Sequence, residues 1–356
     1  MNLPKLTDID VSGKRVLVRM DLDVDNDFTR IELAKDTLRY LKDKGCRIIV
    51  IGHKGRPDGK VVPELSLRRL TDVIAGISET EATFCEEVVG ESVRSQVDNL
   101  QGGKVLLLEN LRFDPGEENN YPEFVQKLAS MGDFYVNESF AVSHRGHASF
   151  VGLPTLLPHA AGFRLLAEVE MLSRVIENPR RPVVAVISGV KKDKLERIAE
   201  MLDIADKVLI GGRLPIYLEK DNPENLRSVF SSASKDAISK IQKNDKVFVA
   251  NLIADTFDIS LNSVQKFKDE ILKAGTIILA GVPGKYEEEG YRQGTKEVFE
   301  AIADSDAYKV AGGGDAEAAI TLLRLNDKFD WISVGGGAML EFLAKGTLPG
   351  IEALRL

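Results

Sequence analysis

The sequence predicts an α/β protein built from two doubly wound parallel-sheet domains, and three observations support this. Short runs rich in Val, Ile and Leu recur along the chain without the polar alternation of a sheet that has one wet face. Segments with helical periodicity separate these runs, and such an alternation of strand and helix is typical of doubly wound folds. The chain has 356 residues, enough for two domains of ordinary size. We therefore expect two Rossmann-like domains joined by a hinge helix.

Ten runs are predicted as strands because each is short, apolar and followed by a polar or glycine-rich turn. They are Arg15–Arg19, Arg47–Ile51, Lys104–Leu108, Phe134–Val136, Val183–Ile187, Lys207–Ile210, Lys246–Ala250, Thr276–Ala280, Tyr308–Ala311 and Trp331–Val334. The intervening periodic segments predict helices at Ile31–Lys44, Pro122–Met131, Leu195–Leu202, Lys296–Ala303 and Ala316–Leu325.

A domain boundary is expected near the proline-flanked stretch Leu153–Pro158. A long helical pattern, Ala160–Glu177, follows it and stops at Asn178-Pro179, because the residue before a proline disfavours the helical conformation. We expect a first domain at 1–158, a connecting helix at 159–178, a second domain at 179–338 and a C-terminal segment at 339–356.

The composition narrows the class of protein. The formal net charge of −8 argues against general nucleic-acid binding, which usually requires a basic domain. A chain with only two cysteines is not built on a disulfide framework, and Met1–Asp10 has no signal-peptide character. No apolar stretch is long enough to span a bilayer. We expect a cytoplasmic protein without nucleic-acid or membrane partners, with a monomer favoured over an oligomer.

Basic residues gather in the turns that follow the strands of the first half. Ligands of parallel sheets bind beyond the carboxyl ends of the strands, so these turns should converge. Arginine forks bind carboxylate and phosphate oxygens, which predicts a pocket for a small polyanion. Any single arginine is more often a solvated surface charge, so the prediction rests on several basic residues at successive strand ends. The candidate residues are Arg30, His53, Arg56, Arg112, His144 and Arg145.

Glycines occupy the equivalent turns of the second half. The triplets at 312–314 and 335–337 precede helical patterns, where backbone N–H groups and the helix dipole attract phosphate. Each triplet is equally compatible with a tight strand-to-helix connection. Asp315 fits either a Mg²⁺ ligand or a helix cap, and its position favours the cap.

Several common sites are excluded by spacing. The Walker pattern is absent, and no predicted strand precedes a complete GxGxxG, so a dinucleotide-binding dehydrogenase is a weak interpretation. His144 and His147 have metal-like spacing, but no Cys or carboxylate cluster lies near them in the sequence to complete a zinc site.

At these turns the sequence resembles the phosphoglycerate kinase family. The matching motifs follow one another in the family's order, and together they are highly specific. They are Val16–Asp21, Gly52–Pro57, Leu108–Phe113, Val136–Phe140, His144–Ser149, Gly312–Asp315, Ser333–Ala338 and Leu348–Gly350.

The resemblance implies an enzyme of glycolysis or gluconeogenesis. Its reaction would be reversible phosphoryl transfer between 1,3-bisphosphoglycerate with ADP and 3-phosphoglycerate with ATP, using Mg²⁺. In the ATP-consuming direction the nucleophile is a carboxylate that is already ionised near neutral pH, so no general base is required. The resemblance further implies that the segment after about Leu340 returns to pack on the first half.

The same resemblance implies roles for individual residues. Binding of the glycerate substrate would fall to Asp21, Asp23, Arg30, His53, Lys54, Gly55, Arg56, Arg112 and Arg145. Binding of the nucleotide would fall to Gly189, Lys191, Lys194, Gly211, Gly212, Glu287, Gly312, Gly313, Gly314 and Asp315, with Asp315 also meeting Mg²⁺. Catalytic roles are implied for Arg30, Lys191, Gly336 and Gly337.

The match has departures. In the first half Asp23 and Asp25 stand where the family has Asn and Pro. In the second half the stretch from Lys191 to Lys194 is one residue short, and the other departures are Ser188, Ala280 and Ala316. Three hypotheses stay open: an active kinase, a metabolite-binding relative with impaired catalysis, and a kinase for a related small phosphorylated acid.

Overall fold

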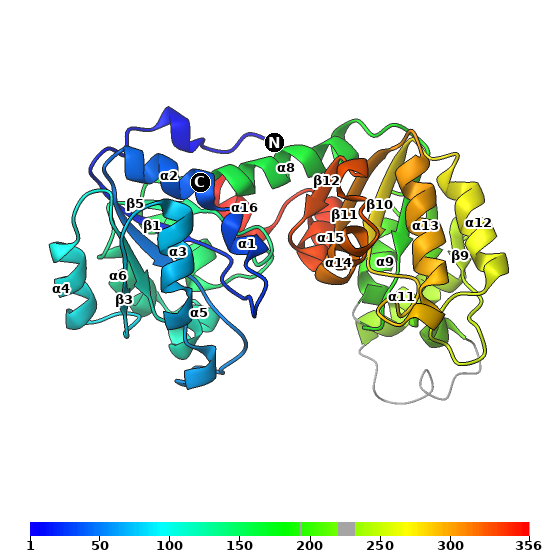
Figure 1. Ribbon diagram of the computed structural model, residues 1–356, viewed down its shortest axis with the longest axis horizontal. Helices are drawn as coiled ribbons and strands as arrows, with labels where there is room; N and C mark the ends of the chain where they lie inside the picture. Colours follow the sequence, from blue (N-terminus) through cyan, green and yellow to red (C-terminus); the bar gives the residue numbers. More distant parts are fainter. Residues whose placement is uncertain (193, 220–231, 356) are drawn as a thin grey trace. The chain divides into compact units, whose positions relative to one another are not determined.

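The chain forms two compact units, each with its own six-stranded sheet (Figure 1). The computed structural model describes residues 1–192, 194–219 and 232–355. The first unit contains Met1–Glu170 and the residues from Thr347 onward, and the second contains Met171–Gly346. The long helix α8, Phe163–Glu177, crosses the division in the sequence. Both sheets are parallel throughout and carry flanking helices, so the predicted fold class is confirmed.

The sheet of the first unit has the strand order β3-β4-β2-β1-β5-β6. Its strands are β1 Arg15–Arg19, β2 Arg47–Ile51, β3 Ala82–Cys85, β4 Val105–Leu108, β5 Phe134–Asn137 and β6 His159–Ala161. Its helices besides α8 are α1 Thr29–Glu32, α2 Lys35–Asp43, α3 Thr71–Ser78, α4 Glu91–Asn99, α5 Pro115–Asn119, α6 Pro122–Ala129, α7 Leu153–Leu156 and α16 Pro349–Glu352.

The central strands of the first unit are buried on both faces. Val16 and Val18 of β1 belong to the core cluster that α2 and α3 cover, and these two helices lie side by side (Figure 1). Leu17, between them on the opposite face, is also fully buried. Burial on both faces explains why the strand has no polar alternation.

The sheet of the second unit has the order β12-β11-β10-β7-β8-β9. Its strands are β7 Val183–Ile187, β8 Lys207–Ile210, β9 Val247–Val249, β10 Thr276–Ala280, β11 Tyr308–Gly312 and β12 Trp331–Ser333. Its helices are α9 Lys194–Met201, α11 Ser232–Gln242, α12 Leu261–Ile271, α13 Gln293–Asp304, α14 Gly314–Leu322 and α15 Gly336–Lys345. Helices α12 and α13 lie side by side and pack Phe267 and Phe299 into one core (Figure 1).

Two strands and one helix break differ from the sequence prediction. β3 lies at a sheet edge and is only partly buried, so its sequence lacks the apolar run used to recognise strands. β6 has three residues, His159–Ala161, and occupies the start of the segment expected to be the connecting helix. The predicted helix Ile31–Lys44 is divided into α1 and α2, with Leu33 and Ala34 between them.

The last described residues pack against the first unit. Gly350 of α16 donates its N–H to the carbonyl oxygen of Ser143 at 2.8 Å. Leu348, Ile351 and Leu354 are almost fully buried. These residues therefore form part of the first unit's core although they follow the second unit in the chain.

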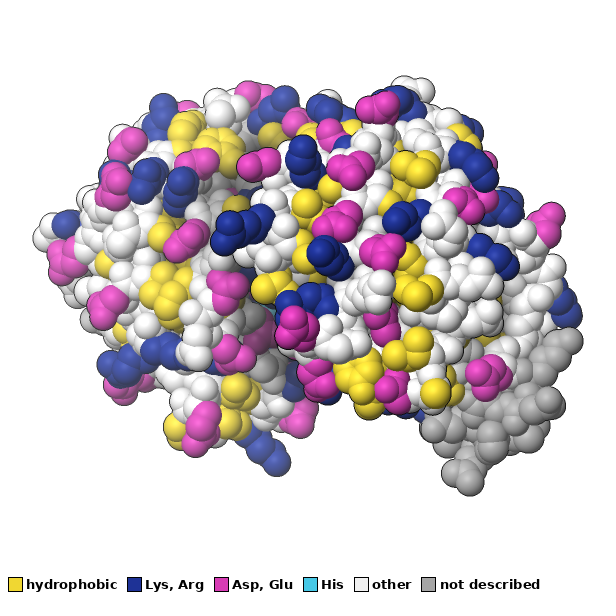
Figure 2. Space-filling view, turned by 45° about the vertical axis from the view of Figure 1, so that its right-hand side comes forward, with side chains coloured by type: hydrophobic (Ala, Val, Ile, Leu, Met, Phe, Trp, Pro, Cys, Tyr) yellow, Lys and Arg dark blue, Asp and Glu magenta, His cyan; other side chains and the backbone are white. Residues whose placement is uncertain are grey.

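The surface carries both signs of charge. On the face shown in Figure 2, basic side chains in dark blue and acidic side chains in magenta alternate, with small yellow hydrophobic patches among them. Among the described residues, no helix has both the length and the apolar character needed to cross a membrane.

Candidate functional site

The carboxyl ends of four neighbouring strands bring the predicted anion-binding residues of the first unit together. Strand order places β4, β2, β1 and β5 next to one another. The turns that follow them contain Asp21 after β1, His53 after β2, Arg112 after β4 and Arg145 after β5. Convergence at one sheet edge is the arrangement that parallel topology requires.

Arg19 was not among the predicted site residues. It is a buried residue whose side chain contacts several residues at this edge of the sheet. Its guanidinium is fully buried and lies over the Phe150 ring, 4.5 Å from the centroid. Its Nε donates to Ser149 Oγ at 3.0 Å, and Nη2 lies 2.8 Å from His53 Nδ1. No signal in the sequence marks Arg19, since the strand both begins and ends with an arginine.

The Arg19 contact fixes the state of His53. A guanidinium has only donors, so the Nδ1 of His53 must accept and its ring proton must lie on Nε2. Burial, followed by the nearby Arg19 and Arg112, lowers the pKa of His53 well below its usual value. His53 is therefore a neutral imidazole that presents an Nε2–H donor.

Glu117 of α5 is a fully buried carboxyl group that bonds to Ser149. Its carboxylate accepts from the Ser149 N–H at 3.0 Å and from Ser149 Oγ at 2.6 Å. Arg19 contacts the same Ser149 hydroxyl, so Glu117 and Arg19 are linked through one residue. Burial raises the pKa of Glu117, and the Arg19 charge acts against that rise.

Arg112 binds the loop that carries His53. Its Nη1 donates to the Gly55 carbonyl oxygen at 2.7 Å, and its Nε lies 3.2 Å from Glu118 Oε1. The Arg112 side chain is almost fully buried. The loop and the arginine therefore support one another.

Asp21 is a buried carboxylate with room for a partner. Neither of its oxygens has a hydrogen bond among the described residues, and the closest described cation is Arg30, whose Nη1 lies 3.8 Å from Oδ2. Burial raises the pKa of Asp21, while Arg30 and Arg19 act in the opposite direction. Buried polar atoms of this kind usually meet a partner, which makes Asp21 a candidate acceptor for a ligand hydroxyl.

The remaining predicted substrate residues differ in exposure. Arg56 is exposed, and its side chain makes no ion pair or hydrogen bond within the described ranges. Arg145 is half-buried and close enough to act on His53 and His147. Burial and the surrounding arginines lower the pKa of His147 to about 3. Basic residues therefore surround two neutral imidazoles.

Asp23 and Lys54 contact neighbouring loops. Asp23 Oδ1 accepts the Gly55 N–H at 3.0 Å, and Lys54 Nζ lies 3.2 Å from Asp25 Oδ1. Both side chains thus have partners within the first unit.

In the second unit, three glycines pack backbone against backbone at the ends of β10, β7 and β8. A Cβ on Gly212 would lie 2.4 Å from the Gly189 nitrogen, and one on Gly281 would lie 2.2 Å from the Ser188 oxygen. Gly189, Gly212 and Gly281 all have positive φ, which only glycine adopts at little cost. Side chains are thereby kept away from this edge.

Lys194 lies over these glycines, whereas Lys191 extends into solvent. Lys194 Nζ donates to the Ser188 carbonyl oxygen at 2.6 Å and lies 2.7 Å from where a Gly281 Cβ would be. Lys191 is exposed in the turn before α9. The structure therefore brings Lys194 to the glycine edge.

The two glycine triplets meet at the neighbouring strands β11 and β12. A Cβ on Gly336 would lie 2.8 Å from the Gly313 Cα, so the turns touch through their backbones. Helices α14 and α15 begin at Gly314 and Gly336. Gly337 follows in the first turn of α15, and no atom lies within 4 Å of its ideal Cβ position.

Asp315 and Glu287 are both exposed near Tyr286. The two carboxylates contribute, after burial, to a raised pKa of Tyr286. Asp315 lies in the first turn of α14, whose N-cap residue is Gly313.

Mg²⁺ fits this edge through a single protein carboxylate. No group of three or more His, Cys, Asp or Glu side chains with metal-ligand geometry occurs in the described part of the chain. Mg²⁺ commonly binds through one or two carboxylates together with substrate phosphates. The exposed carboxylate of Asp315 matches that mode.

The three residues of the second unit at which the sequence departs from the resemblance lie in buried or strand positions. Ser188 is buried, and its hydroxyl has no hydrogen-bond partner among the described residues. Ala316 is fully buried in the core cluster, and Ala280 is the last residue of β10. A threonine at position 316 would therefore place its hydroxyl in an apolar environment.

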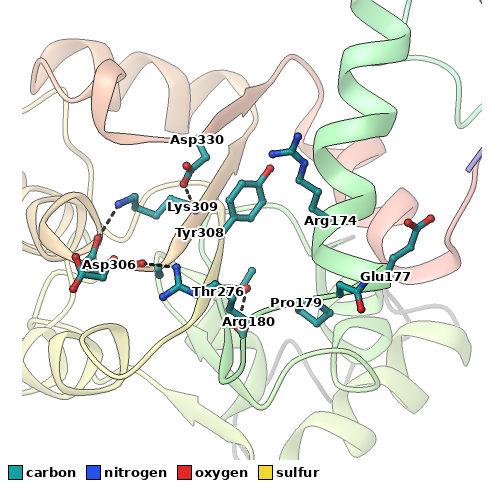
Figure 3. A pocket seen from close by; sticks show the side chains of 12 residues that line it. Arg174, Glu177, Pro179, Arg180, Thr276, Asp306, Tyr308, Lys309 and Asp330 are labelled. Atoms are coloured by element: carbon teal, nitrogen blue, oxygen red, sulfur yellow. Dashed lines mark hydrogen bonds between the residues drawn. The ribbon is translucent and has the colours of Figure 1, made fainter.

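A separate cavity of about 590 Å³ lies at the opposite edge of the second sheet (Figure 3). It is lined by the starts of β10 and β11 and by the end of α8. Its polar groups are largely engaged: Arg180 donates to the Asp306 carbonyl oxygen, Lys309 Nζ to Ser305 O, and the Lys309 N–H to Asp330. Acidic and basic groups are mixed there, so the cavity favours no ligand class.

Fold and sites together define a class of protein. It is an α/β protein whose first unit presents an arginine and histidine pocket suited to a small anion. Its second unit presents a glycine-lined edge with helix N-termini, which suits phosphate groups. Such a combination is typical of phosphotransferases that act on small acids.

Comparison with known proteins identifies the particular family. The family model for phosphoglycerate kinase matches residues 6–253 and 229–346. Phosphoglycerate kinases of Dictyoglomus turgidum and Thermosipho africanus are 35% and 36% identical, covering 98% and 99% of this chain and 98% of each relative. The chain belongs to the phosphoglycerate kinase family.

Solved structures agree. The phosphoglycerate kinase of Coxiella burnetii matches with a TM-score of 0.81 at 28% identity, covering 99% of both chains. The enzyme of Pyrococcus horikoshii matches with a TM-score of 0.84 at 26% identity, covering 99% of this chain and 98% of that one. Both likenesses extend over both units.

Proposed function

We propose that this protein catalyses the phosphoglycerate kinase reaction, the reversible transfer of a phosphoryl group between 1,3-bisphosphoglycerate with ADP and 3-phosphoglycerate with ATP. The observation that carries the proposal is the cluster around His53, where the buried Arg19 and Arg112 and a neutral imidazole lie at the carboxyl edge of the first sheet. Family membership supplies the reaction, and this basic cluster suits an acidic substrate. A role in glycolysis or gluconeogenesis follows from that reaction.

In the first unit, we assign binding of the acid to side chains. Guanidinium groups of Arg30, Arg56 and Arg145 are half-buried or exposed and can reach carboxylate and phosphate oxygens. His53 would donate from Nε2, and the unpartnered carboxylate of Asp21 would accept from a substrate hydroxyl. Arg112 and Gly55 would hold the loop on which His53 lies.

In the second unit, we assign binding of the nucleotide phosphates to backbone. The packed glycines Gly189, Gly212 and Gly281 let the phosphates approach the sheet edge. Helices α14 and α15 direct their N-terminal N–H groups to the same edge. Lys191 and Lys194 would supply positive charge, and Glu287 would meet the ribose.

The reaction itself needs alignment and charge neutralisation more than proton transfer. In the ATP-consuming direction a carboxylate oxygen attacks the γ-phosphorus, a new O–P bond forms, and the bond to the ADP oxygen breaks. The nucleophile is already ionised, so no side chain has to remove a proton. The chain's contribution is to hold two anions and to stabilise the charge that spreads over the transferring group.

We assign the metal to the second unit. Mg²⁺ bound with the nucleotide would neutralise phosphate oxygens, and Asp315 would be its protein ligand.

A coupled assay with 3-phosphoglycerate, ATP and Mg²⁺ tests the proposal directly. The expected result is steady formation of ADP and 1,3-bisphosphoglycerate, lost when either substrate is omitted. Absence of turnover with every nucleoside triphosphate, together with measurable 3-phosphoglycerate binding by calorimetry, would identify a metabolite-binding relative instead. Faster turnover with another phosphorylated acid would identify a different kinase.

Two lysine variants separate the roles within the second unit. If Lys191 neutralises the transferring group, Lys191→Ala lowers kcat by more than about tenfold, equivalent to about 1.4 kcal/mol of barrier. Lys194→Ala should act mainly on the KM for ATP, because Lys194 already lies at the glycine edge. A kcat loss below about tenfold in Lys191→Ala would transfer the neutralising role away from Lys191.

A further inference from the structure

We infer that Asp23 and Asp25 are positioning residues that hold the Lys54–Arg56 loop of the first unit, and that neither binds the acidic substrate. The inference rests on the proposed function for its kinetic test, but the contacts that carry it lie entirely within the first unit. Asp23 and Asp25 both lie in the segment that follows β1, beside the loop that carries His53. Two carboxylates beside an anion pocket would repel an acidic ligand unless other groups engage their charge.

Asp23 is bonded to the backbone of the loop. Its Oδ1 accepts the N–H of Gly55 at 3.0 Å. Gly55 has a φ of +64° and a would-be Cβ only 2.8 Å from Leu65 Cδ2, so the chain is tightly turned at this residue. The bond from Asp23 fixes the direction in which that peptide group points.

The same peptide group and the next one are also held by side chains. The Lys54 carbonyl oxygen, in the peptide group that Asp23 binds, accepts from Asn110 Nδ2 at 2.7 Å, and the Gly55 carbonyl oxygen of the next peptide group accepts from Arg112 Nη1 at 2.7 Å. Asp23 is therefore one of three side chains that hold the backbone at Lys54 and Gly55. Loss of the Asp23 acceptor would loosen the loop on which Arg56 is carried.

Asp25 acts on the same loop through a charge. Its Oδ1 lies 3.2 Å from Lys54 Nζ, with side-chain exposures of 92% for Asp25 and 8% for Lys54. Arg69 adds a second attachment, since its Nη2 donates to the Val24 carbonyl oxygen at 2.6 Å and lies 3.8 Å from Asp25. The pair thus neutralises an enclosed ammonium group and fixes Lys54 toward Asp25.

The two carboxylates should contribute unequally to holding the loop. Both carboxylates are exposed, but Asp23 accepts a directed hydrogen bond from a backbone N–H, whereas Asp25 forms an ion pair, and exposed ion pairs contribute little. Asp23 is therefore expected to dominate and Asp25 to contribute a smaller effect.

Two substitutions at Asp23 separate positioning from charge. Asp23→Ala removes the acceptor for Gly55 and should raise the KM for 3-phosphoglycerate about tenfold, with the KM for ATP changed less than about twofold. Asp23→Asn keeps the Oδ1 acceptor and should stay within about threefold of the original enzyme. The matched control is Glu64→Gln, which removes an exposed charge from the same unit.

The outcomes decide the inference. Equal impairment of Asp23→Ala and Asp23→Asn would overturn it, because the charge itself would then be required. A lower KM in both variants would also overturn it, because repulsion of the substrate would then be the main effect of Asp23.

A double-mutant cycle tests Asp25. Asp25→Ala and Lys54→Met should each raise the KM for 3-phosphoglycerate about two- to threefold. The KM of the double variant should be no higher than that of the more impaired single variant. Fully additive losses would show that the two residues act separately and would overturn the assignment of Asp25.

Hydrogen exchange keeps the inference testable if the enzyme reaction itself is absent. The Gly55 amide should be protected in the original protein and in Asp23→Asn, and should exchange at least about tenfold faster in Asp23→Ala. Unchanged exchange in Asp23→Ala would overturn the inference whether or not the protein is a kinase. A failed activity assay with the expected exchange pattern would reject only the proposed function.

Discussion

The two units prepare for anions in opposite ways. The first unit uses charged side chains, and these need buried support: Arg19 holds His53, and Glu117 balances Arg19 through Ser149. The second unit uses backbone, and its requirement is the absence of side chains at Gly189, Gly212 and Gly281. A site built from side chains depends on a supporting network, whereas a site built from backbone depends on close packing of the chain itself.

This comparison predicts that the two binding sites can be damaged independently, and the largest effect should come from Arg19. Arg19→Met leaves Glu117 buried without its cation and frees His53 Nδ1. Affinity for 3-phosphoglycerate should fall roughly 100-fold, and the first unit should lose about 3 kcal/mol or more of stability. Calorimetry with 3-phosphoglycerate and, separately, with ATP measures both affinities.

Arg19→Lys keeps the charge and serves as the variant that remains folded. It should no longer fix the tautomer of His53, but it keeps a positive charge near Glu117. Its affinity for 3-phosphoglycerate and its stability should therefore lie between those of the original protein and Arg19→Met. Equal losses of ATP and 3-phosphoglycerate affinity in these variants would contradict the independence of the two sites.

The next effect concerns the backbone site. Gly212→Ala introduces a Cβ 2.4 Å from the backbone nitrogen of Gly189, at a φ of +63°. Because a backbone atom cannot move aside like a side chain, ATP affinity should fall about tenfold, with a stability loss of about 1–3 kcal/mol. Gly290→Ala, where no atom lies within 4 Å of the new Cβ, is the matched control for the second unit. Loss of 3-phosphoglycerate affinity in Gly212→Ala would contradict the independence of the two binding sites.

The effect that bears least on the two binding sites is a pH dependence of stability confined to the first unit. Burial raises the pKa of Glu138 to about 8, although its Oε1 accepts the Arg164 N–H at 3.1 Å. In the unfolded chain the Glu138 carboxyl ionises near the ordinary pKa of 4.5. Between about pH 4.5 and pH 8 the unfolded state therefore releases a proton that the folded state keeps, which favours unfolding as the pH rises. The stability of the original protein should therefore decline across that interval.

Glu138→Gln removes this ionisation and keeps the acceptor for Arg164. Its melting temperature should exceed that of the original protein at pH 8, with a smaller difference at pH 5. Calorimetric scans at both pH values measure the difference, and Glu123→Gln on the exposed side of α6 is the control. A difference that stays constant between pH 5 and pH 8 would exclude the ionisation as its cause.

The fold was largely predictable because most strands are buried on both faces. Val16–Val18 and Val183–Ile187 are apolar throughout, and short runs of this kind between turns are typical of strands in a parallel sheet. β3 and β6 escaped prediction because neither contains a run of large apolar residues: β3 reads Ala-Thr-Phe-Cys and β6 reads His-Ala-Ala. The break between α1 and α2 carries no proline or glycine to announce it.

The sites were predictable where they lie in turns. Residues directly after strands must converge in a parallel sheet, so His53 and Arg112 could be named without coordinates. Arg19 and Glu117 could not, because their importance comes from contacts between distant segments. The same holds for Asp23, whose partner is the backbone of Gly55 and not a side chain that a motif would display.

The position of the last residues has a consequence for biosynthesis. Leu348, Ile351 and Leu354 are buried in the first unit, and Gly350 bonds to Ser143 there, yet the ribosome translates them after the whole of the second unit. The first unit must therefore wait for its final piece until the whole of the second unit has been synthesised. During that interval the surface that these leucines and isoleucine will cover stays open to chaperones.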